Sequence, residues 1–132
     1  EVELSQYEDY FRDELKQSAD YDSIYWPKSR AKTMSEKERR CVDGCATFFK
    51  ASKFECIDKH LIEFSQAVLQ SPDFERTDDV YNRMMTKDHI AVFALLEHKE
   101  TGTRLILANT HLHWDPAFAD VKLIQTAMLI NE

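Results

Sequence analysis

Two histidines and an aspartate near the C-terminus have the residue types and the spacing of a chemical site. They lie in the segment Asn109-Thr110-His111-Leu112-His113-Trp114-Asp115-Pro116, directly after the almost wholly apolar run 104–108. On a strand, residues two apart share a face, so His111 and His113 are expected to point the same way, with Asn109 one step behind them. Because imidazoles donate hydrogen bonds and bind metals, the segment predicts a polar site where a buried strand ends.

Other interpretations of this segment remain open. The pattern His111-x-His113-x-Asp115 is similar to the T-H-x-H-x-D-H motif of metallo-β-lactamase-fold zinc hydrolases, although Pro116 stands where that motif has its last ligand. His113 can also be a packed, hydrogen-bonded histidine beside Trp114. Asp115 and Pro116 are typical of a helix cap and a first helical residue, and that role needs no chemistry.

Strands and helices alternate along the chain and would position these residues. The pattern predicts strands over 21–26, 42–50, 54–57, 90–96 and 104–108. It predicts helices after a capping box Ser5-x-x-Glu8, over 77–85 and from Asp115 onward, and leaves 58–69 ambiguous but part helical. The runs 90–96 and 105–108 are nearly continuous apolar stretches, so both strands are expected to be buried on both faces beneath further layers.

Composition restricts the class of protein. The 132 residues are enough for one domain at most, and no apolar run approaches the ~20 residues of a membrane span. The three cysteines have neither disulfide nor zinc spacing, and reduced thiols are typical of the cytoplasm or nucleus. A net charge of −7 opposes nucleic-acid binding through overall charge. Six basic residues between Lys28 and Arg40 form either a solvated loop or one that faces phosphates.

Both ends of the chain are abrupt, with Glu1-Val2-Glu3 lacking a start signal and a helix still running at Glu132. The sequence is therefore expected to be a fragment of a larger α/β domain.

Several motifs occur together in one order and carry a family resemblance. They are Pro27-Lys28-Ser29-Arg30-Ala31-Lys32-Thr33-Met34, Val42-Asp43-Gly44-Cys45-Ala46-Thr47-Phe48-Phe49-Lys50, Asn82-Arg83-Met84-Met85-Thr86-Lys87-Asp88, and Thr110 to Pro116 with Asp120-Val121-Lys122-Leu123-Ile124-Gln125-Thr126. The chain closely resembles the nuclease domain of the carbon catabolite repressor deadenylase, a poly(A)-shortening exonuclease of the endonuclease/exonuclease/phosphatase superfamily. The resemblance extends nearly end to end.

The resemblance implies an α/β fold in which a two-sheet β-sandwich is flanked by outer helices, with residues 1–132 forming a partial nuclease domain. It implies Mg²⁺-dependent release of 5′-AMP from the 3′ end of poly(A). Glu1 corresponds to the metal-binding glutamate of the family, His111 to the histidine that meets the scissile phosphate, and Pro116 to the proline that packs on adenine. Asn109 and His113 are further substrate-binding candidates on the same segment. A Mg²⁺ ion and a donor to a phosphate oxygen are what phosphodiester cleavage requires.

Two departures from the family pattern stand out. The family usually has Asn at the position of His89, and its later Asp-x-Asn and Ser-Asp-His motifs do not occur before Glu132. We therefore expect the fragment alone to be inactive. The parent is expected to act on poly(A) RNA in mRNA decay, in the cytoplasm and nucleus, with deadenylase complex subunits bound through regions outside this chain and no membrane partner. The alternatives are a zinc-dependent hydrolase built on His111, His113 and Asp115, or a non-catalytic binding relative of the same fold.

Overall fold

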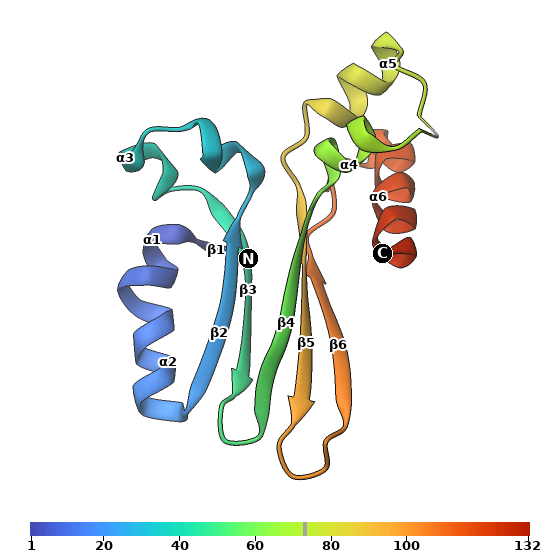
Figure 1. The fold of residues 1–132 in the computed structure, drawn as a ribbon. Helices are drawn as coiled ribbons and strands as arrows, with labels where there is room; N and C mark the ends of the chain where they lie inside the picture. The colour runs from blue at the N-terminus through green and yellow to red at the C-terminus, as the bar shows by residue number, and fades with distance from the viewer. Residues whose placement is uncertain (73) are drawn as a thin grey trace.

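The computed structural model describes residues 1–72 and 74–132, and it contains two antiparallel sheets packed face to face (Figure 1). The first sheet has the order β1-β3-β2, with β1 at Val2–Glu3, β3 at Asp43–Lys50 and β2 at Tyr21–Pro27. The second has the order β4-β5-β6, with β4 at Phe54–Glu63, β5 at Ile90–His98 and β6 at Arg104–Thr110. The α/β class with a two-sheet sandwich and outer helices is therefore confirmed.

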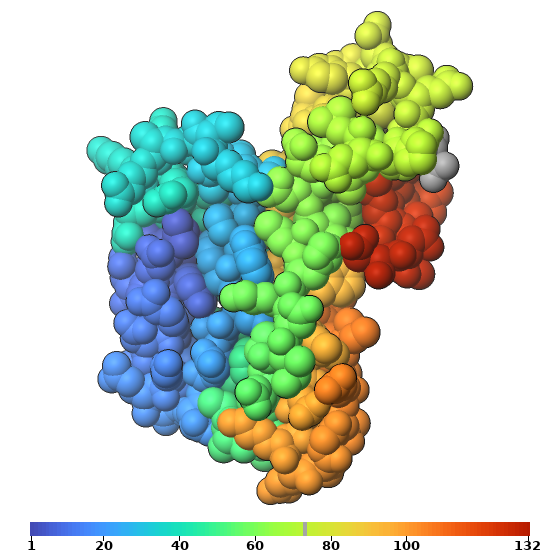
Figure 2. Space-filling view, viewed as in Figure 1, coloured from blue at the N-terminus to red at the C-terminus, as the bar shows by residue number. Residues whose placement is uncertain are grey.

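Helices cover the outer faces and the upper end of the sandwich (Figure 1). The first sheet is flanked by α1 (Leu4–Gln6), a π-helical turn (Tyr7–Phe11) and α2 (Arg12–Ala19). A 3-10 turn (Ser29–Thr33) and α3 (Glu36–Arg39) lie above it. At the upper end of the second sheet lie α4 (Phe64–Gln70), α5 (Asp78–Val80) and a second π-helical turn (Tyr81–Met85) (Figure 1). A 3-10 turn (Pro116–Phe118) then leads into α6 (Ala119–Asn131), which lies beside this sheet. The space-filling view is hollowed at the top, between α3 with its preceding turn and α4 with α5 (Figure 2).

The main core lies between the two sheets and depends on strand alternation. Ile24 and Phe49 face inward from the first sheet, and Val92 and Leu96 from β5 pack against them. Alternate residues of β5 point the other way, and Ala91 packs there in a second cluster with side chains of α6. Because β5 is covered on both faces, its continuous apolar sequence is explained.

The second strand predicted to be doubly buried is not. Leu105 and Ile106 on β6 are 49% and 69% exposed. Within the described residues β6 is an edge strand of its sheet, and α6 packs near Ala91, beside the upper part of the sheet and away from the lower part of β6 (Figure 1). The prediction of a buried strand at 104–108 is therefore wrong for this chain. An apolar sequence favours burial, but burial also requires another layer of structure to cover that face of the strand.

The local sequence patterns at helix starts and in the stretch 58–69 agree only partly with the structure. The expected capping box at Ser5 does not form, because the helix already begins at Leu4 and has no side-chain cap. A capping box does form in the basic segment, where the Ser35 hydroxyl accepts from the Glu38 N–H and the Glu38 carboxylate accepts from the Ser35 N–H. The ambiguous stretch 58–69 contains the end of β4 and then α4. Among the described residues no helix is long and apolar enough to cross a membrane.

Candidate active site at the converging strand ends

Ends of strands from both sheets meet where the predicted catalytic residues lie. Glu1 directly precedes β1, and His111 directly follows β6 in the other sheet. Although the two residues are 110 positions apart, Oε2 of the Glu1 carboxylate contacts Nδ1 of His111. The His111 side chain remains 48% exposed, so its other face is open to solvent. The fold therefore brings together the two residues for which the sequence predicted catalytic roles.

A lysine that sequence analysis placed only in a basic segment completes this contact. Lys28 follows β2, and its Nζ lies 2.6 Å from Oε1 of Glu1 and 2.5 Å from Oδ2 of Asp43. Burial acts to lower the pKa of the Lys28 ammonium, but its hydrogen bonds to Asp43 and Glu1 raise that pKa above the ordinary value. Lys28 is therefore a fixed positive charge beside the Glu1 carboxylate at neutral pH.

Asp43 links this lysine to a second cation. Its Oδ1 accepts from Nη2 of Arg30 at 2.8 Å, and Nη1 of Arg30 contacts Asp88, which precedes β5 in the other sheet. Burial acts to raise the pKa of the Asp43 carboxyl, but its hydrogen bonds from Lys28 and Arg30 lower it well below the usual range. Asp43 therefore pairs with two cations, Lys28 and Arg30. The chain of charges from Glu1 to Asp88 joins both sheets.

Gly44 allows the two strands of this network to approach. A Cβ at Gly44 would lie 2.2 Å from the backbone oxygen of Trp26 and 2.7 Å from Cα of Pro27. No side chain fits there, so the end of β2 can cross close over β3. The Lys28 N–H then donates to the Asp43 carbonyl at 2.9 Å, which places the lysine side chain above the carboxylate. The absence of a side chain at Gly44 therefore makes this close backbone approach possible.

Asn109 holds the two sheets together behind His111. Its Nδ2 donates to the carbonyl of Ala46 at 3.0 Å and to Oγ1 of Thr47 at 3.1 Å, both on β3. Since the amide nitrogen is used in these bonds, the structure gives Asn109 a role in joining the sheets. Its contact with substrate stays a prediction.

His113 lies in surroundings opposite to those of His111. Because β6 ends at Thr110, strand alternation does not apply to the following residues, and the expected shared face of His111 and His113 is wrong. His113 is 8% exposed, and its ring packs at right angles to those of Phe118 and His89, with centroids 5.0 and 5.2 Å away. The prediction of a packed histidine is confirmed. Its hydrogen bond, however, runs through the backbone, where the His113 N–H donates to Oε1 of Gln125 at 2.9 Å.

Burial keeps the two packed histidines neutral. It lowers the pKa of His89 to about 4 and lowers the pKa of His113 below its ordinary value. A buried neutral ring does not approach a phosphate, so this conformation favours a packing role for His113, and its substrate contact stays a prediction. The zinc alternative is disfavoured as well. His113 is buried and His111 is exposed, so the two side chains do not converge on one ion. Residues 1–72 and 74–132 contain no group of three or more His, Cys, Asp or Glu side chains that could hold a metal ion.

The end of the loop is a helix start that presents two flat side chains. Oδ1 of Asp115 accepts from the Ala117 N–H at 2.9 Å, and Pro116 opens the 3-10 turn before α6, so the predicted cap is confirmed. Pro116 is exposed, and Trp114 is 75% exposed. This arrangement leaves the proline ring accessible on the same loop as His111.

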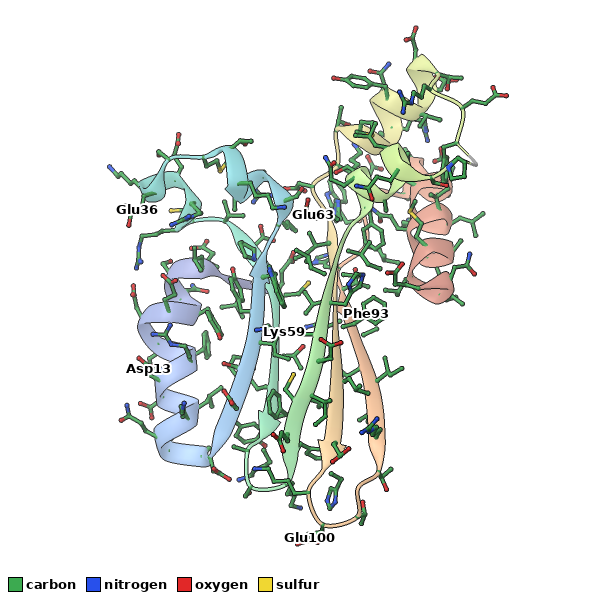
Figure 3. The ribbon with its side chains drawn as sticks, in the orientation of Figure 1. Asp13, Glu36, Lys59, Glu63, Phe93 and Glu100 are labelled. Carbon is green, nitrogen blue, oxygen red and sulfur yellow. The ribbon has the colours of Figure 1, made fainter. Side chains whose placement is uncertain are left out.

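Carboxylates of the chain itself pair with several cations of the basic segment. Lys28 and Arg30 are held as described, Lys32 contacts Glu63 at the end of β4, and Arg40 pairs with Asp9 at 2.5 Å. Figure 3 shows Glu63 at the upper end of β4, facing the turn that carries Lys32. The structure therefore favours a structural role for much of this segment, and contact with RNA phosphates stays untested.

Four residues around the site were not predicted to have roles there: Lys28, Asp88, His89 and Gln125. Three of them stand in the motifs quoted for the family resemblance or directly beside them, and His89 was noted only as a departure from the family pattern. The sequence offered two signals for these residues. One is a basic residue, Lys28, after a proline that ends a strand, and the other is a glutamine, Gln125, on an apolar helix face. Neither signal indicates which partner the side chain would find.

The donor chemistry fits a hard divalent cation such as Mg²⁺. The carboxylates of Glu1 and Asp43 are oxygen donors, and Mg²⁺ is usually bound through one or two carboxylates while it keeps several waters. The Glu1 side chain is 27% exposed, so a cation can reach it from solvent. The described residues thus supply up to two carboxylate ligands for such an ion.

The fold is that of the endonuclease/exonuclease/phosphatase proteins. The chain superimposes on an endonuclease/exonuclease/phosphatase from Bacteroides vulgatus with a TM-score of 0.66 and 20% identity, over 99% of this chain and 42% of the other. It superimposes on the human Nocturnin catalytic domain with a TM-score of 0.63 and 23% identity, over 98% of this chain and 44% of that domain. Similarity at this level of identity establishes the fold.

Sequence comparison then identifies the relatives. All 132 residues align at 58% identity with the CCR4-Not complex 3′-5′-exoribonuclease subunit Ccr4 of Mycosarcoma maydis, and at 54% with the protein of the same name from Aspergillus fumigatus. The resemblance inferred from the motifs is confirmed, because the whole chain is homologous to a segment of Ccr4 exoribonuclease subunits. The chain spans about a fifth of the length of these relatives (20% and 19%). No family model matches the chain.

Proposed function

We propose that the protein containing this segment is a Mg²⁺-dependent 3′→5′ exoribonuclease that shortens poly(A) and releases 5′-AMP in mRNA decay. Its relatives are named 3′-5′-exoribonuclease subunits of the CCR4-Not complex. The observation that carries the proposal is the contact between Glu1 and His111 across 110 residues. A carboxylate for a hard cation beside a donor for a phosphate oxygen is a pair that phosphodiester cleavage uses.

Each residue of the site has a role that follows from the chemistry of its side chain. Glu1, with Asp43 behind it, would hold the cation, which when bound neutralises charge on the phosphodiester. His111 would donate a hydrogen bond from its exposed face to a non-bridging phosphate oxygen. Lys28 orients the Glu1 carboxylate and adds positive charge beside it. Asp43 and Arg30 keep that lysine in place through a chain of ion pairs.

Substrate and partner assignments belong to the same proposal. Pro116 offers an exposed, flat apolar surface to a base next to His111, which suits stacking without base selectivity. Adenine selectivity requires hydrogen bonds to the base edge, which stacking does not supply. We propose poly(A) RNA as the substrate, other subunits of a deadenylase complex as partners, and the cytoplasm and nucleus as the sites of action.

The test uses the full-length protein and labelled RNA with a 3′ tail of adenines. We expect stepwise shortening from the 3′ end in Mg²⁺, loss of activity in EDTA, and 5′-AMP as the product in chromatography. Matched RNAs that end in uridine or cytidine measure tail preference. Internal cuts, a nucleoside 3′-monophosphate product, or equal cleavage of all tails would each contradict the proposal.

A further inference from the structure

Gln125 is a polar residue that is fully buried. It lies on α6, its side chain is 0% exposed, and Oε1 accepts the backbone N–H of His113 at 2.9 Å. Glutamine is mostly an exposed residue in folded proteins, so full burial needs an explanation. The N–H that it holds lies two residues after His111 and three before Pro116, in the middle of the loop that carries both.

The polar groups around this bond are costly to bury. His89 and His113 are 7% and 8% exposed. Nδ1 of His89, both ring nitrogens of His113 and Nε2 of Gln125 have no hydrogen-bond partner within the described part of the chain. Buried polar groups are usually paired, and an apolar side chain at position 125 would leave the buried His113 N–H without its acceptor. The acceptor for this backbone N–H is therefore what distinguishes the glutamine from an apolar side chain of the same size.

The helix that carries Gln125 is itself anchored. Val121, one turn earlier on the same face, is 0% exposed and packs with Val68 and Met84. At the start of α6, Asp120 accepts from Nε and Nη2 of Arg83 at 2.6 Å each. Because α6 is fixed by packing and by this ion pair, Gln125 presents a stationary acceptor to the loop.

We propose that Gln125 is a positioning residue for the phosphodiester cleavage, acting through the His113 N–H on the loop that carries His111. The inference rests on the proposed function. The bond fixes the backbone between the end of β6 and the cap at Asp115, so it sets where the His111 imidazole stands relative to Glu1. A displacement of about 1 Å at a reacting group can lower a rate by ~10²-fold.

The experiment compares three variants of the full-length protein. Gln125→Met keeps the length and volume but has no acceptor for the His113 N–H. Gln125→Glu keeps an oxygen at the same reach. Val121→Ala removes packing from the same helix face and leaves the hydrogen bond intact. Poly(A) hydrolysis gives kcat and KM, thermal unfolding gives stability, and amide hydrogen exchange reports protection of the peptide 111–118.

Loss of the acceptor should act on turnover. We expect Gln125→Met to lower kcat about 10-fold or more with KM within about threefold, and to speed exchange of the loop. Gln125→Glu should recover much of both, and Val121→Ala should keep wild-type kcat and loop protection even where its melting temperature falls further. If Gln125→Met does not fold, Gln125→Asn withdraws the amide by one methylene and should reproduce the loss.

Two results would overturn the inference: wild-type kcat in Gln125→Met or Gln125→Asn, or an equal kcat loss in Val121→Ala at the same loss of stability. Failure of the proposed function is separable, because it shows as a wild-type protein that does not shorten poly(A). If the wild-type protein is inactive, amide hydrogen exchange still tests the positioning role. Unchanged protection of the loop in Gln125→Met would then contradict that role.

Discussion

His111 and His113 are two residues apart, and their surroundings differ in every respect that decides chemistry. The His111 ring is 48% exposed and contacts a carboxylate that also holds Lys28. The His113 residue is 8% exposed, and its ring packs against Phe118 and His89. One face of the loop is therefore charged and open, and the other is neutral and closed.

This difference shows how one short loop can present a residue to substrate on one face and be held in a fixed position by packing on the other. Charges on the open face can meet a cation and a phosphate because solvent and substrate reach them. On the closed face, burial keeps His89 and His113 neutral, and the Gln125 side chain holds the backbone. Variants on the open face should therefore change turnover, and variants on the closed face should change stability or the position of the loop.

The largest expected effect is on the open face. In the full-length protein, Glu1→Gln should lower poly(A) hydrolysis in Mg²⁺ by about 10²-fold or more, because an amide is a weaker ligand than a carboxylate for a hard cation. The measurement is the initial rate over a range of Mg²⁺ concentrations, since weaker ligation should be partly compensated at high Mg²⁺. Activity within about threefold of wild type would remove Glu1 from the metal site.

A pH effect should mark the closed face. The pKa of His89 falls from about 6.5 in an unfolded chain to about 4 in the fold, so the unfolded state binds the proton first as pH falls. Stability is fully present above pH 6.5, and roughly 2 kcal/mol of it should be lost by pH 5 through this residue.

The control for this effect is His89→Asn, which introduces the residue usual in the family. Chemical denaturation of both proteins at pH 7 and pH 5 measures the difference in unfolding free energy. Wild type should lose about 2 kcal/mol more than His89→Asn between these values. Parallel losses in the two proteins would mean that His89 titrates normally and that the closed face is not dry.

A smaller effect is expected where the loop turns into α6. Pro116→Ala removes an apolar stacking surface, and stacking contributes ~1–3 kcal/mol per base. We expect a weaker apparent affinity for RNA by about tenfold, with the same factor for adenine and other homopolymers that the enzyme cuts. Steady-state kinetics on matched tails provide the measurement. A loss confined to adenine tails would show that Pro116 reads the base and does not only stack on it.

Sequence patterns predicted the elements of this fold better than their surroundings. The continuous apolar run of β5 and the cap at Asp115 are local properties, and both were predicted correctly. The exposure of Leu105 and Ile106 was missed because burial depends on which layer covers a strand, and an apolar run does not specify that layer. The capping box expected at Ser5 does not form, because the helix begins at Leu4, directly after β1 ends at Glu3.

The same limit applies to the site. Glu1 and His111 were predicted through motifs whose order along the chain is specific to a family. Their contact, and the insertion of Lys28 between Glu1 and Asp43, depend on how the two sheets pack, which no local pattern specifies. The expected pairing of His111 with His113 was wrong for a local reason, because the strand ends at Thr110 and its alternation ends with it.

The most direct test of the two-faced loop compares His111→Ala with His113→Ala in the full-length protein, measuring kcat for poly(A) and the melting temperature of each. His111→Ala should lower kcat by about 10²-fold at a nearly unchanged melting temperature, the range expected for loss of one donor to a reacting oxygen. His113→Ala should lower the melting temperature by several degrees and leave kcat within a few-fold where the protein is folded. Equal catalytic losses in both variants at unchanged melting temperature would contradict the account, because both histidines would then act on the substrate or on a shared metal.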